Sequence, residues 1–164
     1  MAIITDYTDL ISLATAKTYL RIDDDITGVD VEVGIMIDSA CELIEQYTQV
    51  FLKPQSKTFY FNTQNYARVY AYPITAITAP ASADDYEVTV KQLYSVYELN
   101  NTTLESITAS IGHSDTTNVK AIFIQAVLET VKLWFYGSET ETVMKGYVPS
   151  SVMAILSSER RFIF

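Results

Sequence analysis

The sequence predicts an α+β fold, a helical bundle of about four helices with a small antiparallel β region inserted between the second and third helices. Apolar residues recur at spacings of three and four in four stretches, which predicts helices near 12–21, 30–50, 118–136 and 149–158. Between the second and third of these stretches, residues 54–111 form short runs rich in Tyr, Val, Thr and Phe. Asn, Asp and Pro interrupt these runs, as is typical of short antiparallel strands.

Length and composition limit the class of protein. A chain of 164 residues is expected to form one domain, 1–164, with a core that needs neither metals nor disulfides. Its only cysteine, Cys41, excludes an intrachain disulfide and is expected in the core, and with one histidine, His113, no Cys and His zinc site can be built. No long charge-free apolar run and no signal-peptide pattern is present, so we expect a soluble protein made in the cytoplasm, without a membrane span.

The first expected helix, over 12–21, begins with Ser12 as its N-cap. Its apolar face is formed by Leu13, Ala16 and Leu20. The second, over 30–50, is the clearest amphipathic pattern in the chain and is roughly 30 Å long. Its apolar stripe consists of Val33, Ile37, Ala40, Ile44, Tyr47 and Phe51. Glu42 and Glu45 are expected on its solvated side, where a pair of carboxylates is usually no more than a charged surface.

The turn between these helices raises the question of a calcium site. Asp23, Asp25 and Thr27 alternate ahead of Gly28, as in the first half of an EF-hand loop. The twelfth loop position, which requires a bidentate Glu, is Gly34 and has no side-chain oxygen. We therefore favour a solvated acidic turn and keep a calcium-binding module as the alternative.

Residues after the second helix predict a group of short strands and then two more helices. The strands are expected near 56–62, 67–71, 74–79, 85–90, 93–99 and 104–110. Apolar residues then cover nearly the whole circumference of the helix at 118–136, more than one small domain is expected to bury, so a subunit interface is its natural second use. Candidate interface residues on it are Phe123, Val127, Trp134 and Phe135. Pro149 suits the first turn of the last helix.

The segment RRFIF, residues 160–164, would leave apolar surface in water if it were exposed. We expect it to dock either in its own core or on a partner, and both alternatives stay open. Its candidate contact residues are Arg160, Arg161, Phe162 and Phe164. A total of 12 tyrosines also favours an interaction protein, because Tyr is enriched at interfaces.

The sequence offers little support for a catalytic site. His113 is the one side chain with an ordinary pKa near neutrality, and its neighbours Ser114 and Asp115 invite comparison with a catalytic triad. Adjacency in sequence does not supply the geometry of a triad, in which the base lies between nucleophile and acid. With only five glycines, neither a phosphate-binding loop nor a dinucleotide fingerprint can be built. We expect no catalytic residue, cofactor or metal, and therefore not an enzyme.

Five stretches in order carry a resemblance to a known family. They are SLATAKTYLRIDDD, IDSACELIEQYTQVFLKPQSKTFYF, YPITAIT, NVKAIFIQAVLETVKLWFYGSE and VPSSVMAILSSERRF. Together they resemble the head–tail connector (adaptor, or head-completion) proteins of tailed bacteriophages, the group often called gp6-like or gp15-like. The chain departs from the family pattern in the inserted ITGV after the acidic residues and in a longer β region that is richer in tyrosine.

The resemblance implies a structural virion protein at the head–tail junction, present in the host cytoplasm during assembly. It implies a homo-oligomeric ring of roughly a dozen copies, joined head to tail, beneath the portal protein. The ring would bind the tail or further neck proteins and conduct DNA during genome packaging and ejection. A net charge of -9 fits a conduit that DNA passes without specific binding, with Asp23, Asp24 and Asp25 as bore-lining candidates. A tail-completion or neck protein that does not contact the portal is the alternative.

Overall fold

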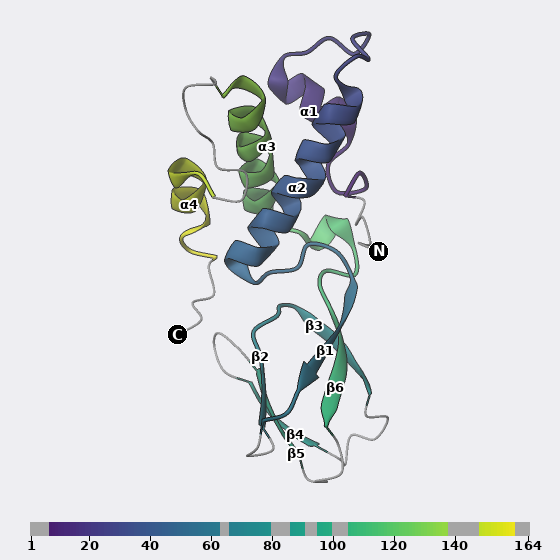
Figure 1. The fold of residues 1–164 in the computed structure, drawn as a ribbon, viewed down its shortest axis with the longest axis vertical. Coiled ribbons are helices and arrows are strands. Elements are labelled where there is room, and N and C mark those ends of the chain that lie inside the picture. Colours follow the sequence, from purple (N-terminus) through teal and green to yellow (C-terminus); the bar gives the residue numbers. More distant parts are fainter. Residues whose placement is uncertain are drawn as a thin grey trace. The chain divides into compact units, whose positions relative to one another are not determined.

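The computed structural model describes residues 7–62, 66–79, 86–90, 95–99, 105–137 and 148–159. Within these residues the predicted α+β class is confirmed, because four helices are present and the strands lie between the second and third of them (Figure 1). The helices are α1 (Leu13–Leu20), α2 (Asp30–Thr48), α3 (Ala121–Tyr136) and α4 (Ser150–Leu156). Contacts divide the chain into two compact units: a helical unit, within Met1–Thr48 and Val119–Arg160, and a β unit, within Gln49–Asn118.

The helical unit is held together by apolar faces that meet in one core. Helix α2 packs on α3, α3 on α4, and α1 on both α2 and α3. The stripe predicted on α2 is buried at Val33, Ile37, Ala40 and Ile44, and the neighbouring Cys41 is buried with it, as expected. The other helices contribute Ala16, Leu20, Phe123, Ala126, Val127, Val131, Val152 and Leu156 to the buried set.

Local signals at the helix ends agree with the predicted boundaries to within a few residues. The hydroxyl of Ser12 accepts a hydrogen bond from the Thr15 backbone N–H at 3.1 Å, which confirms the predicted N-cap. Helix α2 ends at Thr48, two residues earlier than expected, because Gln49 adopts a φ of 59°. Phe51, expected at the end of the α2 stripe, therefore belongs to the core of the β unit.

The β unit consists of two three-stranded antiparallel sheets rather than one region. One has the order β1-β6-β3 and the other the order β2-β5-β4. The strands are β1 (Gln55–Tyr60), β2 (Tyr66–Val69), β3 (Ile74–Ala79), β4 (Tyr86–Val90), β5 (Ser95–Leu99) and β6 (Ser106–Ile111). All six predicted strands are present, whereas their division into two sheets is not visible in their sequence patterns.

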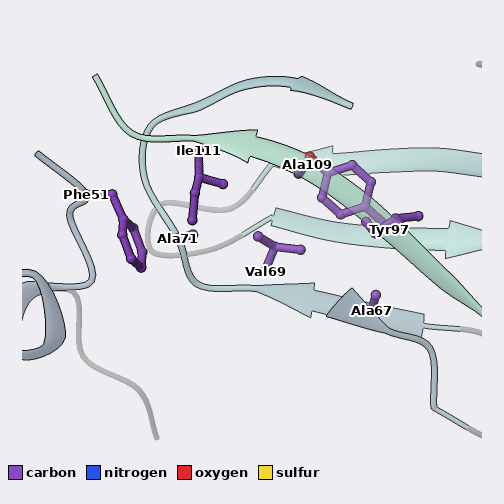
Figure 2. Close-up of a cluster of buried hydrophobic side chains, with 8 residues drawn as sticks. Phe51, Ala67, Val69, Ala71, Tyr97, Ala109 and Ile111 are labelled. Atoms are coloured by element: carbon purple, nitrogen blue, oxygen red, sulfur yellow. The ribbon is translucent and has the colours of Figure 1, made fainter. Parts of the chain in front are cut away.

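Both sheets share a single apolar core (Figure 2). Strand β6 alternates strictly, so that every second side chain is buried. The buried cluster comprises Phe51, Ala67, Val69, Ala71, Tyr97, Ile107, Ala109 and Ile111. In the β1-β6-β3 sheet, two irregularities interrupt the pairing of β3 with β6. At these points the hydroxyls of Thr75 and Thr78 donate hydrogen bonds to the carbonyls of Ser110 and Thr108, at 3.0 Å each.

Gly112, directly after β6, is required by the backbone. It adopts a φ of 95° and its N–H donates to the carbonyl of Pro73 at 2.8 Å. A Cβ at this position would lie 1.9 Å from the carbonyl oxygen of Lys53. No other residue type satisfies both conditions without displacing the neighbouring backbone.

Candidate functional site

The acidic turn between α1 and α2 is organised by a lysine. The ammonium of Lys17 donates to the carbonyls of Asp24 and Ile26 at 2.9 and 2.8 Å and to a carboxylate oxygen of Asp30 at 3.0 Å. The Lys17 side chain is buried, so this charge is neutralised inside the unit rather than by water. An internal cation therefore already binds the carbonyl oxygens of the loop, which is the arrangement of a structural turn.

The side chains of Asp23, Asp24 and Asp25 are exposed on this turn. They are therefore in water, as the acidic-turn hypothesis requires. Among the described residues, no group of three or more His, Cys, Asp or Glu side chains is arranged to hold a metal ion. Lys17 escaped the sequence analysis, although it lies four residues after Leu13 and three before Leu20, on the apolar face of α1, and a lysine there signals a paired, buried charge.

Two tyrosines fasten α1 to α3 and so fix the base of the turn. The Tyr19 hydroxyl donates to Glu129 Oε1 at 2.6 Å, and the Tyr136 hydroxyl donates to the carbonyl of Leu20, in the last turn of α1. The hydrogen bond to Glu129, together with burial and the charge of that carboxylate, raises the pKa of Tyr19 to about 12. Lys132 lies 5.7 Å from the centre of the Tyr19 ring and adds a cation–π contact.

The interface residues expected on α3 fall into two groups. Phe123 and Val127 are buried inside the helical unit, so they present no surface to a partner. Trp134 and Phe135 are half-buried near the end of α3 and do present surface. The remaining expected contacts, Arg160, Arg161, Phe162 and Phe164, lie outside the described residues.

The two most exposed large apolar side chains in the described part of the helical unit are on α2. Val31 and Ile35 are 77% and 61% exposed, although both are large aliphatic residues. They line an open groove of about 660 Å³ that also contains Met36, Leu43 and Trp134. Its polar lining is Glu32, Ser39, Glu42 and Gln46, with Gly28 at one end. We call this feature the α2 groove; it has apolar walls and two exposed carboxylates.

Sequence reasoning missed the α2 groove because it assigned only one apolar stripe to α2. Val31 and Ile35, four residues apart, begin a second stripe beside the buried one. Trp134, from α3, forms part of the groove wall, and its indole N–H is buried with no hydrogen-bond partner among the described residues. A buried indole donor usually has a partner, so this part of the wall is unsatisfied in the isolated chain.

The pair of carboxylates expected on the solvated side of α2 is divided by the fold. Glu42 is exposed as predicted, but the prediction for Glu45 is wrong, because that residue is only 4% exposed. Tyr7 is buried near it, and burial together with the Glu45 carboxylate raises the pKa of the Tyr7 phenol above its usual range. The Tyr7 N–H donates to Asp38 Oδ1 at 3.0 Å, and this bond holds Tyr7 on α2. Burial of Glu45 follows from where the N-terminal residues pack, which periodicity within α2 does not specify.

His113 and its neighbours form a turn in the β unit. The His113 N–H donates to the carbonyl of Phe51 at 3.1 Å. Asp115 accepts the Thr117 N–H at 2.9 Å, and this bond lowers the pKa of its carboxyl. Asp115 thus caps the short 3-10 helix Thr116–Asn118.

No described helix is long and apolar enough to cross a membrane.

No family model and no curated protein matches this chain. Solved structures do resemble it in fold. A chain in the neck of an empty GTA particle, computed with C6 symmetry, matches with a TM-score of 0.72 and 14% identity, over 100% of this chain and 96% of that chain. A chain in the virion of a native gene transfer agent (GTA) particle gives 0.68 and 14%, over 94% and 91%. A chain in the neck of a native GTA particle, computed with C12 symmetry, gives 0.63 and 13%, over 99% and 97%.

Proposed function

We propose that this chain is a structural, non-enzymatic protein of a phage-like virion, located in the neck, where copies of it form an adaptor ring between the portal and the tail. The observation that carries the proposal is the likeness of fold to chains of gene transfer agent necks, which extends over essentially the whole of both chains. The motif order of the sequence supports the same family of roles independently, since those motifs resemble phage head–tail connectors. The narrower gp6-like or gp15-like grouping stays a prediction.

A ring needs two different adhesive faces on each subunit, because head-to-tail contacts join unlike surfaces. The α2 groove supplies one candidate face, with exposed aliphatic side chains that a lone copy leaves in water. The half-buried Trp134 and Phe135 extend the candidate surface onto α3. C6 and C12 symmetry in the neck structures that this fold resembles is consistent with a cyclic assembly of this kind.

The charge of the chain supports the role of a conduit. With a net charge of -9 per copy, a ring of many copies creates a strongly negative field that repels DNA phosphates. Asp23, Asp24 and Asp25 are the bore-lining candidates, because their side chains are exposed together on one turn. DNA then passes along the ring without being retained.

Co-assembly with the portal tests this proposal. The full chain is mixed with the portal protein encoded in the same genome, and the complex is examined by cryo-electron microscopy. We expect a closed ring on the portal, because head-to-tail contacts can close into one, with about a dozen copies, the number that the resemblance to head–tail connectors implies. A ring that forms only with tail components would support instead a neck or tail-completion protein that does not contact the portal. A chain that stays monomeric with the portal and with all neck and tail components would overturn the proposal.

A further inference from the structure

We propose that the α2 groove binds the segment RRFIF, residues 160–164, of a neighbouring copy. This inference rests on the proposed function, since it names the contact by which adjacent subunits of the ring are joined. The groove includes the two most exposed aliphatic side chains in the described part of the helical unit, and RRFIF is the segment whose apolar residues are expected to dock.

The groove and the segment are chemically complementary. Apolar side chains of the groove, among them Val31, Ile35 and Trp134, match Phe162, Ile163 and Phe164, and two phenylalanine rings alone bury about 300–500 Å² when covered. Glu32 and Glu42, exposed in the groove, match the two positive charges of Arg160 and Arg161. No other stretch of the sequence places two arginines directly before three large apolar residues.

Reach favours a neighbour over the same chain. Glu159, the last described residue, binds Lys120 at 2.8 and 2.9 Å, at the beginning of α3. Trp134 is about 21 Å of helix rise from Lys120. Residues 160–164 span at most about 18 Å when extended, and Phe162 lies only about 10 Å along that path. In the register given below, Phe164, at the far end of this span, is the residue that must cover Ile35. A neighbouring copy can supply it without this limit on length, and a ring already brings such a copy into contact.

The spacing of groove residues also matches an extended segment. Glu42 and Ile35 are separated by about 10 Å of rise along α2. The three steps from Arg161 to Phe164 in an extended segment cover about the same distance. In this register Arg161 pairs with Glu42 while Phe164 covers Ile35.

Trp134 reports directly on this contact, because it is the only tryptophan of the chain. A peptide of residues 158–164 with blocked ends contains neither Trp nor Tyr and is titrated into a chain that stops at Glu159. We expect the emission of Trp134 to move to shorter wavelength and to saturate, because apolar side chains replace water over the indole. Ile35→Asp is expected to weaken binding about tenfold or more, whereas Ile26→Asp, an exposed position outside the groove, leaves it unchanged.

A charge exchange tests the register. Arg161→Glu in the peptide and Glu42→Arg in the chain are each expected to weaken binding about tenfold, because each leaves like charges opposed. The two changes together are expected to recover most of the affinity. Equal losses in the single and double combinations would refute the pairing of Arg161 with Glu42, and no emission change at any peptide concentration would overturn the whole inference.

Dilution of the full-length chain distinguishes the neighbour from the same chain. If the segment docks on another copy, the emission of full-length protein depends on concentration and that of the chain ending at Glu159 does not. Emission that is independent of concentration, yet differs from the shortened chain, would place the segment on its own subunit and sink the proposal. The portal experiment is separate: a ring without peptide binding refutes this contact alone, and peptide binding without a ring refutes the proposed function alone.

Discussion

Replacing Lys17 by methionine removes the charge on which the acidic turn is built, with little change in side-chain length. The carbonyls of Asp24 and Ile26 and the carboxylate of Asp30 lose bonds of 2.8–3.0 Å to an ammonium that is 4% exposed. Removing one member of a buried ion pair costs about 3–5 kcal/mol. Because the Asp30 side chain keeps 29% of its surface in water, part of that cost is recovered, and we expect a loss of about 2–4 kcal/mol.

Urea unfolding followed by Trp134 emission measures this loss within the helical unit, which contains the only tryptophan. Lys120→Met is the matched control, because Lys120 is 63% exposed in its ion pair with Glu159 and is expected to contribute about 0–1 kcal/mol. A Lys17→Met loss no larger than that of the control would refute the argument. We further expect calcium or a chelator to leave the melting temperature of the native chain unchanged, since Lys17 already holds the loop carbonyls.

Two further predictions concern stability. Gly112→Ala is expected to destabilise the β unit by about 3 kcal/mol or more, because the new Cβ meets the Lys53 carbonyl oxygen and the backbone has a positive φ. Gly34→Ala should instead stabilise the chain by about 0.5–1 kcal/mol, because the space around its Cβ inside α2 is open. Thermal unfolding of the two variants compares these effects. Tyr19 has its pKa raised from 10.0 to about 12, so its stabilising contribution is complete below pH 10 and is lost as the pH rises toward 12; Tyr19→Phe should reduce the fall in stability over that interval, and an unchanged pH profile would exclude the Glu129 bond as its cause.

Much of the fold follows from local pattern. The four helices and six strands appear where apolar periodicity and turn residues predict them, and Ser12 caps α1 as its side chain suggests. These features depend on interactions between residues close in sequence, and such interactions are readable without knowing what packs against them. The acidic turn belongs to the same class, because Asp and Gly favour turns through their own backbone chemistry.

Which surfaces are covered was decided by tertiary packing. The sequence by itself indicated that α3 is too apolar to be covered by one subunit, yet Phe123 and Val127 of α3 are buried within the helical unit. Val31 and Ile35 of α2 are instead left exposed. Periodicity identifies an apolar stripe but does not say what packs against it. Of two adjacent stripes on one helix, the buried one is the stripe on which the other helices pack. For the same reason the burial of Lys17 beneath the acidic turn became visible only in three dimensions, since its partners come from two other segments of the chain.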